Sequence, residues 1–182
     1  MHEVSLNRVI TDYISGQEIM DTTYEDLRQA LARMLVEDRK YPKAVIRPKY
    51  EATYEVGGVQ KAARIDIAVF SEKGDPLLAL FFCPGEVGTF VRESLAVARI
   101  HLPAPFPLVA VTDSMDLQLH AAGNGRLLGE GFHAVPLWED LAALADQNTF
   151  APLAGERLDR ERRIHMAYDG LGGPCCGGEC SL

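Results

Sequence analysis

Residues 64–85, RIDIAVFSEKGDPLLALFFCPG, read as two buried strands joined by a turn. The second strand, residues 76–83, is apolar without alternation, as expected for a central strand that is covered on both faces. The first strand carries one carboxylate, Asp66, among apolar residues. The stretch therefore predicts the centre of a sheet packed between helices, and it raises the question of what an aspartate does there.

The segments before this stretch predict a helix and a further strand. Residues 21–43, DTTYEDLRQALARMLVEDRKYPK, hold apolar side chains at helical spacing, and Thr22 followed by Glu25 is typical of a capping box. Residues 49–56, KYEATYEV, alternate between apolar and polar, and Gly57-Gly58 supplies a tight turn. We expect this strand to form a hairpin with residues 61–70.

The segments after it predict a crossover and a late helix. Residues 86–101 read as a helix, residues 106–112 as a buried strand, and residues 137–147 as a second helix. A strand–helix–strand unit from Leu77 to Thr112 is expected to place its two strands in parallel. The fold class is therefore predicted as α/β, with a central mixed β-sheet flanked by helices.

Length and composition predict one domain with two flanking segments. A chain of 182 residues with 47% hydrophobic content is long enough for one sizeable core. We expect an N-terminal arm over residues 1–20, an α/β domain over 21–148, and a charged, Cys-rich appendage over 149–182. The sequence shows neither a membrane-spanning apolar run nor a secretion signal, so a cytoplasmic location is expected.

Three segments, TDYISG, EDLRQALARMLVE and RIDIAVF, carry a resemblance to a known family. Over roughly residues 7–140 the chain resembles the N-terminal domain of type I restriction enzyme R subunits and its stand-alone relatives. Those proteins belong to the PD-(D/E)xK nuclease superfamily. The resemblance implies a restriction-endonuclease-like core.

The resemblance also implies where a nuclease site would lie. In such nucleases an aspartate ends the second strand, a Glu-x-Lys pair follows on the third strand, and the first helix often adds an acid. The carboxylates hold Mg²⁺, and the lysine helps to position or deprotonate the attacking water. On this chain Glu25 matches the helix acid and Asp66 the aspartate, but Leu80 and Phe82 stand at the Glu and Lys positions.

Neither leucine nor phenylalanine offers an oxygen or a charge to this chemistry. We therefore interpret the chain as a catalytically degenerate domain that acts as a non-catalytic, nucleic-acid-associated or protein-interaction module, with no cofactor expected. Asp66 then has a structural role, paired with Arg64 two residues earlier. The alternative is a Mg²⁺-dependent DNA endonuclease whose site has migrated to Glu86, Arg92 or Glu93.

The last segment supports a second alternative. Cys175, Cys176 and Cys180 lie within six residues of each other and could bind Zn²⁺ or Cu(I), or serve as oxidisable thiols, in a metal- or redox-responsive binding protein. The net charge of -8 argues against tight, non-specific DNA binding. Expected partners are DNA, bound weakly, or another protein, with no membrane association.

Overall fold

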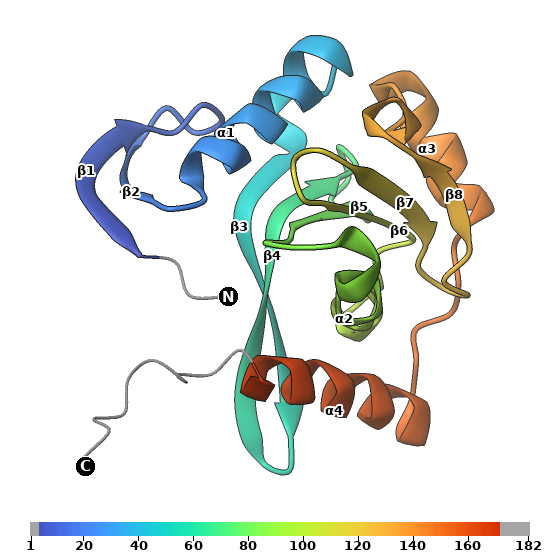
Figure 1. Cartoon of the computed structure of the whole chain (residues 1–182). Helices are drawn as coiled ribbons and strands as arrows, with labels where there is room; N and C mark the ends of the chain where they lie inside the picture. The colour runs from blue at the N-terminus through green and yellow to red at the C-terminus, as the bar shows by residue number, and fades with distance from the viewer. Residues whose placement is uncertain (1–3, 172–182) are drawn as a thin grey trace, which may run out of the picture.

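A six-stranded sheet with the strand order β3-β4-β5-β6-β7-β8 lies at the centre of the computed structural model, which describes residues 4–171 (Figure 1). β5 and β6 are parallel, and every other neighbouring pair in this sheet is antiparallel. The sheet is therefore mixed, as predicted. Its strands are β3 (Ile46–Val56), β4 (Val59–Phe70), β5 (Pro76–Phe82), β6 (Leu108–Thr112), β7 (Leu117–Ala121) and β8 (Leu127–Glu130).

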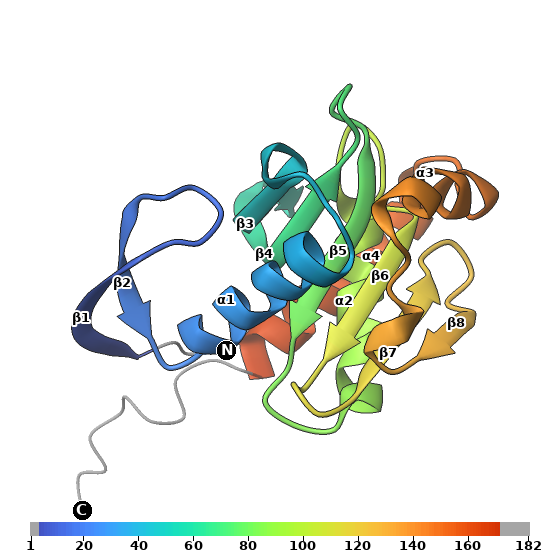
Figure 2. The same ribbon diagram turned by 90° about the horizontal axis from the view of Figure 1, so that it is seen from above.

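Helices cover both faces of the sheet (Figure 2). α1 (Glu25–Arg33), which continues into a π-helical turn at Met34–Asp38, and α3 (Trp138–Gln147) pack on one core. α2 (Val87–Ile100) and α4 (Gly155–Leu171) contribute to the core on the opposite face. This arrangement confirms the predicted α/β class and is consistent with a restriction-endonuclease-like fold. Among residues 4–171, no helix is both long enough and apolar enough to span a bilayer.

The β3–β4 hairpin forms around the predicted glycine turn. Gly57 and Gly58 have φ angles of 58° and 79°, a left-handed conformation that glycine adopts without a Cβ clash. β5 follows and is buried from Leu77 to Phe82, and α2 then leads into the parallel strand β6. The predicted crossover is therefore present between β5 and β6.

In both strands of the β3–β4 hairpin, the side chains that point to one face of the sheet switch to the other face at one position. In β4, Ile65 packs in the α2 core whereas Ile67 packs in the α1 core, although residues two apart normally share a face. The ladder pairs Pro48 with Ile67 and then Tyr50 with Ile65, leaving Lys49 and Asp66 unpaired between them. Lys49 has a φ of 50°, which is uncommon for a lysine. This irregularity turns Asp66 out of the apolar core.

The N-terminal segment holds a hairpin that the sequence patterns did not predict. β1 (Ser5–Thr11) pairs antiparallel with β2 (Glu18–Thr22) in a separate two-stranded sheet beside α1 (Figure 1). β2 ends at Thr22, and the N-cap position of α1 is Tyr24, so the helix begins later than the capping-box pattern predicts. α1 begins at Glu25 behind Tyr24, which makes no side-chain capping bond.

Part of the predicted C-terminal appendage packs against the core. α4 lies across α2 and the β3–β4 hairpin (Figure 1). The buried carboxylate of Glu161 accepts hydrogen bonds from Arg92 at 2.7 and 3.0 Å and from Arg99 at 3.3 Å. The hydroxyl of Tyr54 on β3 lies 2.6 Å from Nδ1 of His165. Glu161 and His165 on α4 are thus each paired with a group of the α/β core.

Candidate functional site

Asp66 lies where β4 meets β5 and the first turn of α1, and both of its carboxylate oxygens are engaged. Oδ1 accepts a hydrogen bond from Nη2 of Arg28 at 3.2 Å, and Oδ2 accepts one from the backbone N–H of Phe82 at 2.9 Å. Arg64, the partner expected from the sequence, is farther away, with its Nη2 atom 4.0 Å from Oδ1. The principal cation beside Asp66 is therefore Arg28.

Glu25 is fully buried at the start of α1, and three side chains contact it. Its Oε2 lies 2.5 Å from Nη1 of Arg28 and 2.5 Å from Nζ of Lys49. Its Oε1 accepts a hydrogen bond from Nε2 of Gln29 at 3.0 Å. Because Arg28 also contacts Asp66, one guanidinium joins the two acids that the family resemblance picks out.

β5 presents apolar side chains beside these acids. Leu80 is fully buried in the α1 core and pairs across the ladder with Ile67. The ring of Phe82 packs against Tyr24, with 5.2 Å between the ring centroids. Phe82 thus contacts Asp66 through its backbone N–H, and Leu80 lies opposite Ile67, the residue that follows Asp66.

Arg28 and Lys49 were missed by sequence reasoning, although two signals point to them. Arg28 follows Glu25 by three residues, a spacing that brings side chains together on a helix. Lys49 and Asp66 lie equally far from the Gly57-Gly58 turn, so hairpin pairing places them opposite each other. The family resemblance does not point to either residue, because it concerns the acids and the lysine of the third strand.

A chain of hydrogen bonds runs from this site to the N-terminal hairpin. Nε2 of Gln29 also donates to Oδ1 of Asp12 at 2.8 Å, and its Oε1 accepts from the backbone N–H of Tyr13 at 2.7 Å. Burial alone would raise the pKa of Asp12, but hydrogen bonds from Ser15 and Gln29 outweigh it and hold the pKa below its usual value. Hydrogen bonds from Ser15 and from Gln29 on α1 thus favour the carboxylate form of Asp12.

The residues at the site do not fit a divalent cation. Mg²⁺ requires oxygen ligands, whereas the two acids here already contact Arg28 and Lys49, and β5 offers only Leu80 and Phe82. Within residues 4–171, no three His, Cys, Asp or Glu side chains are grouped as a metal site would require. The arrangement is a network of internal ion pairs.

The structure places the other predicted candidates elsewhere. Arg92 pairs with Glu161 on α4, on the sheet face opposite α1, while Glu86 is exposed ahead of α2 and Glu93 lies within α2. Cys175, Cys176 and Cys180 lie outside the described residues.

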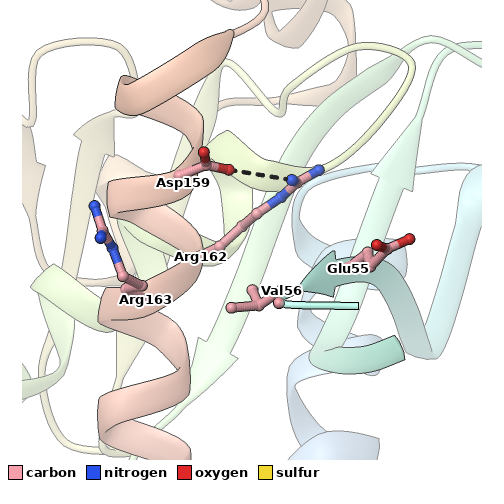
Figure 3. A pocket seen from close by; sticks show the side chains of 6 residues that line it. Glu55, Val56, Asp159, Arg162 and Arg163 are labelled. Carbon is pink, nitrogen blue, oxygen red and sulfur yellow. Dashed lines mark hydrogen bonds and ion pairs between the residues drawn. The ribbon is translucent and has the colours of Figure 1, made fainter. Parts of the chain in front are cut away.

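An open pocket of about 600 Å³ lies away from this site, between the end of the β3–β4 hairpin and α4 (Figure 3). Two basic and two acidic side chains line it, and Asp159 pairs with Arg162 at 3.4 Å. Arg162 and Arg163 extend on different sides of α4 and do not converge. The pocket shows no constellation suited to catalysis.

Comparison with known proteins identifies one family. The family described as "Type I restriction enzyme R protein N terminus (HSDR_N)" matches residues 23–136, which is more than half of the chain and includes Glu25, Asp66, Leu80 and Phe82. Searches of curated proteins and of solved structures returned no significant match. The mixed sheet, the position of Asp66 and this match agree, and the chain belongs to the family of type I restriction enzyme R protein N-terminal domains.

Proposed function

We propose that this chain is a catalytically degenerate restriction-endonuclease-like domain that acts as a non-catalytic module binding nucleic acid or another protein. The observation that carries the proposal is the position of Arg28. Its guanidinium lies between Glu25 and Asp66, at 2.5 and 3.2 Å, where the family resemblance would place a metal ion. A fixed side-chain cation there neutralises the acids that would otherwise bind the metal.

The energetics of this pairing also support a lost activity. Arg28 and Glu25 are each at least 97% buried, so separating them would leave an uncompensated charge in the protein interior. Breaking a buried pair in this way typically costs about 3–5 kcal/mol. A divalent ion would have to overcome that cost with only two carboxylates, because Leu80 and Phe82 add no oxygen ligand.

The proposal is tested by incubating the purified chain with supercoiled plasmid and linear DNA, with and without Mg²⁺ or Mn²⁺. We expect no cleavage by the wild type. Asp66→Ala serves as the control, because a contaminating nuclease would act equally in both preparations. Cleavage by the wild type that disappears in Asp66→Ala would overturn the proposal.

DNA binding is tested separately by fluorescence anisotropy across a salt titration. The net charge of -8 leaves few cations to neutralise phosphates, so we expect weak binding that is lost at moderate salt. Nanomolar binding that resists salt would show that DNA is the principal partner. Weak, salt-sensitive binding favours a protein partner.

A further inference from the structure

α4 carries most of the unpaired cations in the described part of the chain. Of the lysine and arginine side chains in residues 4–171, four make no hydrogen bond, ion pair or ring contact: Lys73, Arg157, Arg160 and Arg163. The three arginines lie on α4 and form the arginine row. The chain holds 26 acidic residues against 18 basic ones, so cations without an internal partner stand out in it.

The arginine row lies along the exposed side of α4. Its members are three residues apart, a spacing at which side chains are neighbours on a helix surface, and all three are exposed. They cover about 9 Å of the helix axis, at a rise of about 1.5 Å per residue. Leu158, Glu161 and His165 turn the other side of α4 toward the core. The row therefore faces solvent at the outside of the fold (Figure 1).

The acidic side chains of α4 do not neutralise the arginine row. Asp159 pairs with Arg162, and the buried Glu161 pairs with two arginines of α2. Among residues 155–168, Glu156 is the only other acid, and it makes no ion pair. Three exposed cations thus stand beside one unpaired carboxylate, which leaves this side of α4 positive.

Cations also crowd the contact between α4 and α2. The carboxylate of Glu161 serves both Arg92 and Arg99, and Arg92 is 37% exposed. Burial holds the pKa of Arg99 below its usual value, and although Glu161 raises it, repulsion from Arg92 and Arg160 lowers it further. One carboxylate is thus surrounded by three cations that repel each other. An anion from outside the chain would relieve this repulsion.

The composition of this surface indicates a nucleic-acid backbone as the anion. Arginine is the side chain best suited to phosphate, because its planar guanidinium donates two parallel N–H···O bonds. A membrane-surface helix needs a free apolar face, whereas Leu158 packs on the core. A folded partner, including a second copy of the chain, needs an apolar or aromatic centre in its interface. Among the described side chains of α4, Met166 is the only large hydrophobic that is exposed.

We propose that the arginine row of α4, extended onto α2 by Arg92, binds the phosphates of nucleic acid. Contacts of this kind act on the backbone and carry no base specificity by themselves. The surface lies on the sheet face opposite α1, and the row lies outside the matched residues 23–136. The inference rests on the proposed function, and it assigns the weak DNA binding expected there to one surface.

The test measures binding of the full chain to a fluorescently labelled DNA duplex of mixed sequence, by anisotropy across a salt titration. Three phosphate contacts predict a slope of about −2.7 for log K against log salt, or about a 40-fold loss of affinity between about 50 and 200 mM salt. The row variant, with Arg157→Gln, Arg160→Gln and Arg163→Gln combined, should weaken binding about ten-fold or more at the lower salt.

The matched control removes the same charge elsewhere. It replaces three other exposed cations with glutamine: Arg33, Lys40 and Lys73. Because charges far from the row are screened, this variant should bind close to the wild type. If thermal unfolding shows that the row variant is unstable, its three single substitutions replace it, and each should lower the slope by about one.

Several results would overturn the inference. It fails if the wild type does not bind the duplex at the lower salt, if the row variant binds as the wild type does, or if both triple variants lose binding equally. Row-dependent binding of poly-glutamate or of anionic lipid vesicles as tight as that of DNA would assign the row to another partner. A concentration-dependent dimer that the row variant abolishes would assign it to a second copy.

Failure of this inference is distinguishable from failure of the proposed function. A chain that does not bind DNA can still act as a non-catalytic module for a protein partner. DNA cleavage that depends on Asp66 would contradict the proposed function, but it would not bear on the arginine row.

Discussion

Arg28 on α1 and Asp66 on β4 are 38 residues apart in the chain, yet their side chains meet at 3.2 Å. The same guanidinium contacts Glu25 at 2.5 Å. The contact joins the first helix to the sheet at the point where β3 and β4 change faces. It gives Asp66 a structural role that does not require the chemistry of its family.

Replacing Arg28 with methionine should destabilise the fold by about 3 kcal/mol in urea unfolding, because Glu25 loses a buried counter-charge. The loss is at the low end for a buried pair, since Lys49 and Gln29 still contact Glu25. Arg64→Met is the control, because Arg64 is 39% exposed and 4.0 Å from Asp66, and it should cost less than about 1 kcal/mol. Equal losses in the two variants would contradict the role assigned to Arg28.

The double substitution Leu80→Glu with Phe82→Lys should restore the charge pattern of the family beside Asp66. It should cost about 2–5 kcal/mol without metal, because two charged groups enter a packed apolar surface. Mg²⁺ or Mn²⁺ should recover part of this loss by binding the folded state alone. Thermal midpoints across a metal titration measure the effect, and Phe82→Lys alone, which adds no carboxylate, should gain less. A folded double variant without any metal-dependent gain would show that the family positions are misplaced.

Replacing Gln29 with alanine should loosen the N-terminal hairpin selectively. The side chain of Gln29 bonds Asp12, Glu25 and the backbone of Tyr13, and leaving such buried groups unpaired costs about 1–3 kcal/mol. Hydrogen exchange should accelerate in β1 and β2 while β5 and β6 stay protected. Gln118→Ala, at a half-buried glutamine on β7, should leave the hairpin unchanged. Uniform acceleration throughout the sheet would mean that Gln29 supports the whole fold.

Replacing Glu161 with alanine should detach α4. Arg99 would lose its acidic partner in a partly buried position, so we expect a loss of about 3 kcal/mol and rapid hydrogen exchange in α4. Asp159→Ala on the same helix is the control, because Asp159 is 60% exposed and its pair with Arg162 should contribute under about 1 kcal/mol. The assignment fails if the Asp159 variant is the more damaging of the two.

His101 should make stability depend on pH in the mildly acidic range. Its Nδ1 lies 2.6 Å from the carbonyl of Ala104, which can only accept, so Nε2 accepts from the hydroxyl of Tyr50 at 2.9 Å. Burial lowers the pKa of His101 below its usual 6.5. The unfolded chain therefore binds a proton first, and the free energy of unfolding should fall as pH drops below 6.5.

His101→Phe should flatten this dependence while lowering the overall stability. Urea unfolding at several pH values between 6.5 and about 5 measures the slope. His120, whose pKa is also lowered by burial, stays in the variant, so a smaller slope should remain. An unchanged slope would exclude His101 as its source.

The sequence was sufficient for β3 to β6, but it did not predict β7 and β8 at one side of the sheet or the elements attached to it. The apolar run of β5 and the glycine turn after Val56 can be predicted from their local sequence. The parallel crossover follows from the order of the elements. The β1–β2 hairpin is exposed along most of its length, so it lacks the alternating pattern of a half-buried strand. α4 is highly charged, and its contacts with Arg92, Arg99 and Tyr54 show that it belongs to the core.

The site was predictable by position but not by its interactions. The family pattern led to Asp66, Glu25, Leu80 and Phe82. The structure links Asp66 to Glu25 through Arg28 and to the backbone of Phe82, and Leu80 lies opposite the neighbouring Ile67. Their partners were not foreseen, because contacts such as Arg28 with Asp66 depend on how α1 crosses the sheet. The spacing of residues within one helix or strand does not predict how that helix packs across the sheet.

The packing of α3 and α4 shows that the folded core includes residues beyond those that match the family. The family match ends at residue 136, just before α3 begins at Trp138. Beyond that boundary, Leu141 fills the core beside α1, and Leu158 packs on the core beside α2. A fragment trimmed to the matched residues 23–136 would expose both cores and leave Arg99 without its acidic partner. An evolutionary boundary is therefore a poor guide to where this chain can be cut.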